Sequence, residues 1–176
     1  MARHTEAMSQ SPLYMISDMV SLWQSRRIQD YELLIHHLTA ELGERFPESM
    51  KNWCGIGERP YPLDFWQVYL VSVNGELAGV TGLYRQPESP SSICWVGWFG
   101  LLPHFRGRSV GASVIAELEQ VARGFGFKEM RVYTDEINET AIMTYKRAGF
   151  TELGVFHRTR GNKSADPDGL VLSVDL

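Results

Sequence analysis

Cysteine is scarce in this chain: only Cys54 and Cys94 among its 176 residues carry a thiol. Two cysteines cannot build the disulfide framework of a small secreted domain, and they form no CxxC spacing of the kind that binds zinc or exchanges disulfides. The N-terminal residues, MARHTEAMSQ, lack the apolar segment of a secretory signal peptide. We therefore expect two reduced thiols in a cytoplasmic protein.

An excess of positive charge is also missing. The 17 Lys and Arg residues are outnumbered by 21 Asp and Glu, which gives a net charge of −4, whereas proteins that bind nucleic acid usually carry a basic excess. No apolar run reaches the roughly 18 residues that a membrane-spanning helix needs. The sequence therefore predicts a protein with neither a nucleic-acid nor a membrane partner.

The rest of the composition is that of an ordinary folded domain. Hydrophobic residues make up 44% of the chain and charged residues 22%, as is typical of globular proteins. A domain of this size buries about 70% of the surface of its unfolded chain, so it needs no metal or disulfide to hold it together. Residues 1–16 are polar and aperiodic and predict a flexible N-terminal arm, and residues 17–176 predict a single domain.

Hydrophobic patterns divide this domain into short elements. Asn74-Gly75, between two runs of β-forming residues, is a strong hairpin signal, and residues 93–102 are apolar throughout, as in a central strand covered on both faces. Because strand side chains alternate, we expect Trp95 and Trp98 on opposite faces. The predicted strands are 18–24, 65–73, 76–85, 93–102, 130–134, 152–158 and 170–174, and the predicted helices are 31–42, 47–50, 110–124 and 138–148.

This order of elements predicts an α/β fold with a mixed central sheet. The hairpins make the first part of the sheet antiparallel. The strand–helix–strand unit that contains residues 110–124 is expected to form a right-handed parallel crossover.

Residues 99–112 carry the clearest chemical signal, because they lead from a buried strand through a basic turn into a helix. The start of a helix offers up to four N–H groups without intrahelical partners and a partial positive charge. Arg106 and Arg108 lie beside it, and Gly107 and Gly111 lack the Cβ that would keep a phosphate from the backbone. The pattern indicates an anion site of pyrophosphate type. The motifs GxxxxGK[ST] and GxGxxG, typical of ATP/GTP loops and NAD sites, are absent.

A second group of residues lies on the predicted helix 138–148. Asn138 is a good N-cap residue, and Ala141 and Tyr145 are one turn apart on the same face. A small residue one turn before a tyrosine leaves room for a ligand against that face. Gly149 fits a left-handed helix stop, with Phe150 packing back on the last turn.

Together, the two stretches resemble the GNAT superfamily of N-acetyltransferases. The phosphate loop of that family reads [Q/R]-x-x-G-x-[G/A], and here the segment reads Arg106-Gly107-Arg108-Ser109-Val110-Gly111. Its later stretch, Asn-x-x-Ala-x-x-x-Tyr-x-x-x-Gly-Phe, is matched in register by Asn138, Ala141, Tyr145, Gly149 and Phe150. The order of elements fits the family over about residues 18–175.

Two positions depart from the family pattern. Ser109 stands where the first glycine of the loop is usual, and we expect it to weaken or alter the cofactor geometry without abolishing binding. Many relatives also carry a carboxylate on the fourth strand that relays a proton to the general base, whereas this chain has Val96, Gly97 and Trp98 there. The general base is therefore unassigned; Asp135 and Glu136, at the end of the fifth strand, are candidates beside water.

The resemblance implies a mostly antiparallel sheet of 6–7 strands with about four helices, and acetyl-CoA bound where strands four and five splay apart. Phe99 and Leu101 would then offer backbone groups to the pantetheine arm, and Asn138 and Tyr145 would face the thioester. The pyrophosphate would be held by Arg106, Gly107, Arg108, Ser109, Val110, Gly111 and Ala112. The implied reaction is direct attack of a primary amine on the thioester, with Tyr145 as the general acid.

No metal is expected to take part. The histidines match no ligand spacing, and no cluster of cysteines or carboxylates joins them. Two other functions stay open: a non-catalytic acyl-CoA-binding regulatory module of the same fold, and acyl transfer to another acceptor. The acceptor itself, a small molecule or a protein amine, is not identified, because residues 31–54 and 158–169, which would line its site, carry no readable motif. The family resemblance also leaves a homodimer open.

Overall fold

The computed structural model describes residues 19–58, 63–156 and 169–176. The predicted arm at residues 1–16 lies outside these ranges, as does most of the segment between the last two strands. In the described ranges, no helix is both long enough and apolar enough to cross a membrane.

The observed order of elements matches the predicted one, with two short 3-10 helices added. The helices are η1 (Ile28–Tyr31), α1 (Glu32–Leu42), α2 (Arg45–Trp53), η2 (Pro103–Phe105), α3 (Val110–Gly124) and α4 (Glu139–Arg147). The strands are β1 (Val20–Trp23), β2 (Phe65–Val73), β3 (Glu76–Arg85), β4 (Ile93–Leu101), β5 (Glu129–Asp135), β6 (Thr151–Phe156) and β7 (Gly169–Asp175).

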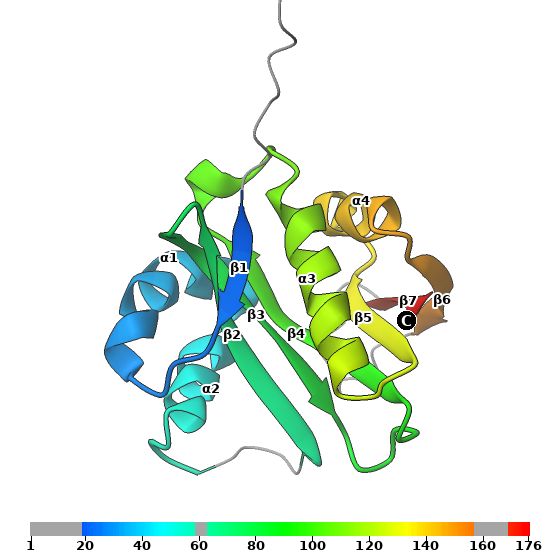
Figure 1. The fold of residues 1–176 in the computed structure, drawn as a ribbon, viewed down its shortest axis with the longest axis horizontal. Coiled ribbons are helices and arrows are strands. Elements are labelled where there is room, and N and C mark those ends of the chain that lie inside the picture. The colour runs from blue at the N-terminus through cyan, green and yellow to red at the C-terminus, as the bar shows by residue number, and fades with distance from the viewer. Residues whose placement is uncertain (1–18, 59–62, 157–168) are drawn as a thin grey trace, which may run out of the picture.

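The strands form one mixed sheet in the order β1-β2-β3-β4-β5-β7-β6. β4 and β5 pair in parallel, and every other neighbouring pair is antiparallel. Helices α1 and α2 lie on one side of the sheet, and α3 and α4 on the other (Figure 1). The predicted α/β fold with a mixed, mostly antiparallel sheet is therefore confirmed.

β4 and β5 separate soon after they begin. Their pairing covers only Ile93 with Glu129, Cys94 with Met130 and Trp95 with Arg131, while β5 continues beside β7 as far as Asp135. The predicted splay of these two strands is confirmed. The expectation that residues 93–102 are covered on both faces holds only for the first half of β4. Residues 97–101 are half-buried, because β5 no longer runs beside them.

A β-bulge redirects the side chains of β4 at the point where the strands separate. Between the pairs Gly82–Gly97 and Val80–Gly100, β4 contains one residue more than β3, and Trp98 has a positive φ of 49°. Its ring packs on Phe46 of α2, with ring centroids 5.6 Å apart.

The predicted opposite orientation of Trp95 and Trp98 is wrong, because the bulge interrupts the alternation along the strand. Trp95 lies opposite Tyr84, and Tyr84 lies opposite Trp66. Trp66 packs edge-on against Trp53 of α2. Trp95 and Trp98 therefore both face the side of the sheet that α2 covers.

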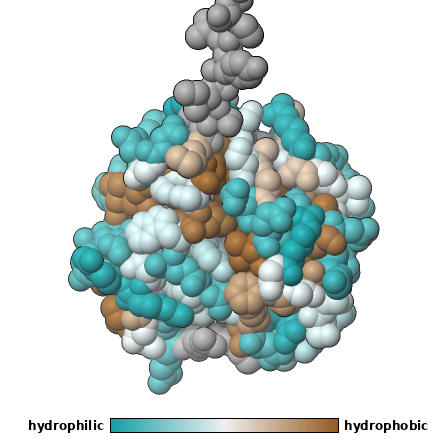
Figure 2. Space-filling view, in the orientation of Figure 1, coloured by the Kyte–Doolittle hydropathy of each residue, from teal (hydrophilic) through white to brown (hydrophobic). Residues whose placement is uncertain are grey.

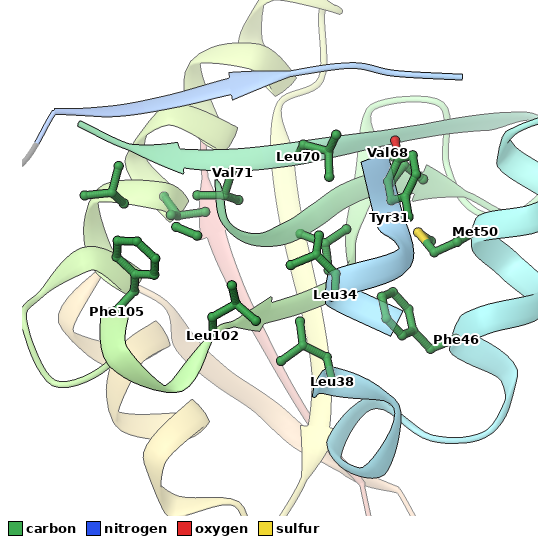
Figure 3. Close-up of a cluster of buried hydrophobic side chains, with 14 of the residues drawn as sticks. Tyr31, Leu34, Leu38, Phe46, Met50, Val68, Leu70, Val71, Leu102 and Phe105 are labelled. Carbon is green, nitrogen blue, oxygen red and sulfur yellow. The ribbon is translucent and has the colours of Figure 1, made fainter. Parts of the chain in front are cut away.

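The core beneath α1 and α2 joins these helices to the sheet. Figure 3 shows Leu34 and Leu38 of α1 close to Phe46 of α2 and to Leu70 of β2, all of them fully buried. On the molecular face seen in Figure 2, hydrophobic patches lie among hydrophilic residues. The apolar face of α1 therefore packs on the sheet next to the bulge in β4, on the side that α2 also covers.

A polar network attaches α2 to the segment before α1. The carbonyl of Ser25 accepts hydrogen bonds from the Tyr31 hydroxyl at 3.0 Å and from Trp53 Nε1 at 2.7 Å. The Arg26 guanidinium lies 3.4 Å from the centre of the Trp53 ring. Burial raises the pKa of Tyr31 to about 12, so this hydroxyl remains a donor at neutral pH. The network fixes the helix that carries Phe46 under Trp98.

Trp53→Phe is expected to lower the free energy of unfolding by about 2 kcal/mol, because it removes a hydrogen bond and leaves a small cavity. Trp23→Phe is the matched control, since Trp23 is 42% exposed, and its effect is expected to stay within about 0.5 kcal/mol. Urea unfolding measures both changes. Equal losses in the two variants would contradict the role given to Trp53.

Candidate functional site

The segment between β4 and α3 forms a tight loop around one buried ring. Phe105 in η2 is 4% exposed and anchors the loop to the core. Beyond it, Gly107 and Ser109 both have positive φ angles, of 72° and 61°. Glycine adopts such angles without strain, whereas serine does so at a cost. The phosphate-loop pattern therefore favours glycine at position 109 because the backbone there has a positive φ angle. Ser109 adopts the same angle, and its backbone is strained.

The loop leaves the N-terminal amides of α3 without intrahelical partners. The first bond at this end runs from the Ser113 amide to the Ser109 carbonyl at 3.3 Å, and the Ser109 side chain makes no capping bond. The first amides of the helix, from Val110 to Ala112, therefore carry the partial positive charge of the N-terminus. The Arg106 amide differs, because it donates to the Pro103 carbonyl at 3.2 Å.

Gly111 is where α3, α4 and β4 come together. A Cβ built on it would lie 3.0 Å from Thr144 Cγ2 of α4 and 3.8 Å from Phe99 Cζ of β4. Sequence reasoning explained this glycine only by the approach of a phosphate. The structure adds a second reason, because the helices pack too closely here for a larger residue to fit without movement.

Tyr145 lies in the same place, between two other aromatic rings. Its centroid is 6.3 Å from that of Phe99 and 5.5 Å from that of Phe150. The residue is 5% exposed, and burial raises its pKa above the ordinary value for tyrosine. Its hydroxyl is therefore protonated at neutral pH. At the start of the same helix, the Asn138 side chain accepts a hydrogen bond from the Ala141 amide at 3.2 Å, which confirms the predicted N-cap.

The Arg106 side chain is bound to the protein itself. Its Nε donates to the Leu101 carbonyl at 2.8 Å, and its Nη2 lies 2.9 and 2.8 Å from the two carboxylate oxygens of Glu41 on α1. Arg108, two residues along, is exposed. Sequence reasoning missed the contact with Glu41, since nothing in the pattern links residues 65 positions apart.

The structure therefore brings the two sequence motifs together on one side of the separated strands. The Phe99 ring packs near that of Tyr145, Gly111 lies beside Thr144 and Phe99, and the loop from Arg106 to Ala112 borders them. Positions 96, 97 and 98 of β4 are Val96, Gly97 and Trp98, so none of them carries a carboxylate. Of the candidate bases, Asp135 ends β5 and Glu136 is exposed. Within the described ranges, no group of three or more His, Cys, Asp or Glu side chains could hold a metal ion.

The regions expected to line an acceptor site are only partly described. Residues 31–54 form α1 and α2, and α2 contributes Phe46 under Trp98. Residues 157–168, which make up nearly all of the second region, lie outside the described ranges.

Comparison with known proteins gives matches of one kind. The model of the acetyltransferase (GNAT) family matches residues 29–150. The chain is similar to the uncharacterized N-acetyltransferase YycN of Bacillus subtilis, with 29% identity over 80 residues, which are 46% of this chain and 51% of YycN. The match thus spans about half the length of that relative.

Two further relatives extend the coverage. The N-alpha-acetyltransferase RimI of Mycobacterium tuberculosis is 29% identical over 120 residues, which are 63% of this chain and 74% of RimI. The solved structure of Mycobacterium smegmatis RimJ, in complex with CoA-disulfide, superposes with a TM-score of 0.69 at 15% identity, covering 89% of this chain and 81% of RimJ. At that identity the superposition supports the fold alone.

Ser109→Gly is expected to raise the free energy of unfolding by up to about 1 kcal/mol, because relief of the left-handed strain outweighs the added freedom of the unfolded chain. Ser113→Gly, one turn into the same helix, is expected to lower it by about 0.5 kcal/mol through helix propensity. Chemical denaturation of the two variants measures the difference in sign. A loss at position 109 as large as that at position 113 would show that Ser109 is not strained.

Proposed function

Because the chain belongs to the acetyltransferase (GNAT) family, we propose that it is an enzyme that transfers the acetyl group of acetyl-CoA to a primary amine by direct attack in a ternary complex. The observation that carries this proposal is the separation of β4 from β5 beside the amide-rich start of α3. An unpaired strand edge and a helix N-terminus suit the two halves of CoA, one a chain of amides and the other a pyrophosphate.

The nucleotide end of acetyl-CoA is assigned to the loop before α3. The amides of Gly107, Arg108, Ser109, Val110, Gly111 and Ala112 would hold the pyrophosphate. Arg106 is the first residue of the same segment. The positive φ angles of Gly107 and Ser109 turn the chain into the helix start, which supports this assignment.

The pantetheine arm is assigned to the second half of β4. After Trp95 the strand pairs only with β3 among the described residues, so the backbone groups of Phe99 and the Leu101 N–H are assigned to another extended chain. The Leu101 carbonyl already accepts a hydrogen bond from Arg106 Nε. Amides of the arm would pair with it as an added strand does. An N–H near Leu101 would also stabilise the tetrahedral oxyanion, an effect worth about 3–4 kcal/mol per donor.

Tyr145 is assigned as the proton donor to the departing CoA thiolate. An ordinary tyrosine, with a pKa of about 10, is already a weaker acid than a thiol of about 8.5, and burial raises the Tyr145 pKa further. Complete transfer of the proton is therefore uphill. The hydroxyl hydrogen-bonds the developing thiolate and donates its proton as the C–S bond breaks, and water then reprotonates or stabilises the tyrosinate. Asn138, at the start of α4, borders the same end.

The attacking amine must lose a proton as well. A lysine-like amine with a pKa of about 10.4 is neutral in only about one molecule in 2,500 at pH 7. Asp135, Glu136 and water remain the candidates for the base. The acceptor is proposed to be an amine of a small molecule or a protein, and RimI, named as an N-alpha-acetyltransferase, supports the second. A cytoplasmic location and a homodimer remain predictions.

A non-catalytic acyl-CoA-binding module is the second candidate. The strained Ser109 and the absence of a carboxylate at positions 96–98 of β4 favour it. It predicts binding of acetyl-CoA without turnover.

Calorimetric titration with acetyl-CoA tests the proposed cofactor, with CoA and NADH for comparison. We expect a dissociation constant in the micromolar range, about −8 kcal/mol, and no heat with NADH. Release of CoA in a screen of amines, including peptides with free α-amines, then separates the enzyme from the module. No binding at millimolar acetyl-CoA would refute both.

Tyr145→Phe is expected to lower kcat at least tenfold, because one hydrogen bond to the leaving group is lost, while the dissociation constant of acetyl-CoA changes less than twofold. The control is Tyr69→Phe, since Tyr69 is also a buried tyrosine with a raised pKa but lies on β2. Steady-state kinetics and calorimetry give the two numbers. An unchanged kcat in Tyr145→Phe would remove Tyr145 from the mechanism.

A further inference from the structure

We propose that Arg106 and Glu41 are positioning residues that tie the cofactor loop and the end of β4 to α1, and that the Arg106 guanidinium is not a ligand of the cofactor phosphates. This inference rests on the proposed function, because it concerns how acetyl-CoA is held. It replaces the phosphate contact that the loop pattern predicts for the Arg106 side chain.

The guanidinium joins three elements at once. Nε donates to the carbonyl of Leu101, the last residue of β4, at 2.8 Å. Nη2 donates to both carboxylate oxygens of Glu41, at 2.9 and 2.8 Å. Arg106 is itself the first residue after η2, so its side chain holds the start of the loop against the end of the strand and the last turn of α1.

Packing holds α1 at the same point. A Cβ on Gly100 would lie 3.1 Å from Leu38 Cδ1 and 3.1 Å from Leu42 Cδ1, so the last turn of α1 lies directly on the backbone of β4. Glu41 is between these two leucines in sequence and extends to Arg106. The apolar contact and the ion pair therefore fix the same two surfaces, which are the side of β4 and the end of α1.

The electrostatics of the pair disfavour a phosphate contact. An arginine binds a phosphate through the same planar fork of donors that it uses for a carboxylate, and here the fork formed by Nε and Nη2 is already used by Leu101 and Glu41. A phosphate brought to the guanidinium would lie near the Glu41 charge and be repelled by it. The phosphates would instead be held by amides at the start of α3, which the Arg106 side chain keeps in place.

The pair is also exposed, with 40% of the Arg106 side chain and 51% of the Glu41 side chain accessible. Exposed ion pairs add little to folding stability. Its loss is therefore expected to change the geometry of the loop and the affinity for the cofactor much more than the melting temperature.

Glu41→Ala separates the two roles of Arg106 by the sign of its effect on the affinity for acetyl-CoA. If Arg106 is held in position by Glu41, the dissociation constant rises, by about fivefold, at an unchanged melting temperature. If Arg106 is a phosphate ligand, removal of the competing carboxylate leaves the dissociation constant unchanged or lowers it, and either result would overturn the proposal. Calorimetry and thermal unfolding on the full chain give both values.

Further variants test the same coupling. Arg106→Lys keeps the charge but lacks Nε and the fork, so it is expected to weaken binding as much as Arg106→Ala, whereas a phosphate ligand would retain part of its effect as lysine. Glu41→Ala added to Arg106→Ala should cause no further loss. Glu41→Asp should restore part of the affinity lost in Glu41→Ala. A further loss in the double variant, or no recovery with aspartate, would contradict the proposal.

Arg123→Ala is the matched control. Arg123 pairs with Glu119 at 3.2 Å on α3 through a similarly exposed arginine. Among the described residues it has no hydrogen bond or ion pair to the loop or to α1, so the affinity for acetyl-CoA should be unchanged. Failure of the wild-type chain to bind acetyl-CoA would refute the proposed function and this inference together. Binding in the wild type with no loss in Glu41→Ala would refute the inference alone.

Discussion

β4 and β5 pair over three residues and then part, and the remainder of the site is organised around that separation. Backbone N–H and C=O groups need partners, so a strand that loses its neighbour inside a sheet must find another. Here β5 keeps β7 as its partner up to Asp135, while β4 from Val96 onward pairs only with β3 among the described residues. A central strand is thereby turned into a local edge, next to a helix N-terminus whose amides also lack partners.

The bulge in β4 places different aromatic side chains on the two sides of the sheet. It directs Phe99 toward α3 and α4, where Gly111, Thr144 and Tyr145 meet it. It also directs Trp98 to the opposite side, against Phe46 of α2. One extra residue in the strand therefore places the Phe99 ring on the side of α3 and α4 and the Trp98 ring on the side of α1 and α2.

Close packing of helices against β4 connects these aromatic residues to the loop that would hold the pyrophosphate. Gly111 lets α3 and α4 approach β4, and Gly100 lets α1 lie on the same strand from the other side. A Cβ at either position would lie within 3.0–3.1 Å of side-chain methyl groups of the neighbouring helix, which would have to shift to make room. The ion pair between Arg106 and Glu41 adds a directional bond to this packing. The loop is therefore held from the side of the sheet that carries α1 as well as from the side that carries α3 and α4.

The order of elements, the hairpin at Asn74-Gly75, the loop and helix start after β4, and the capping of α4 by Asn138 could all be predicted from the amino-acid sequence. These are local features, since hydrophobic period, turn residues and caps act over a few positions. Local alternation also predicted opposite faces for Trp95 and Trp98, and the apolar run predicted cover on both faces of residues 93–102. The first expectation is wrong and the second holds only for the first half of β4, because a bulge and a diverging neighbour depend on how separate strands fit together.

The partners of the candidate residues, in contrast, depend on contacts that form only in the folded chain. The tertiary structure placed Glu41 against Arg106 from 65 positions away, and it buried Tyr145 between Phe99 and Phe150. The same residue types at the same spacing could have faced solvent. A side chain's partner and its pKa depend on the groups that surround it in space, and folding brings those groups together from distant parts of the chain.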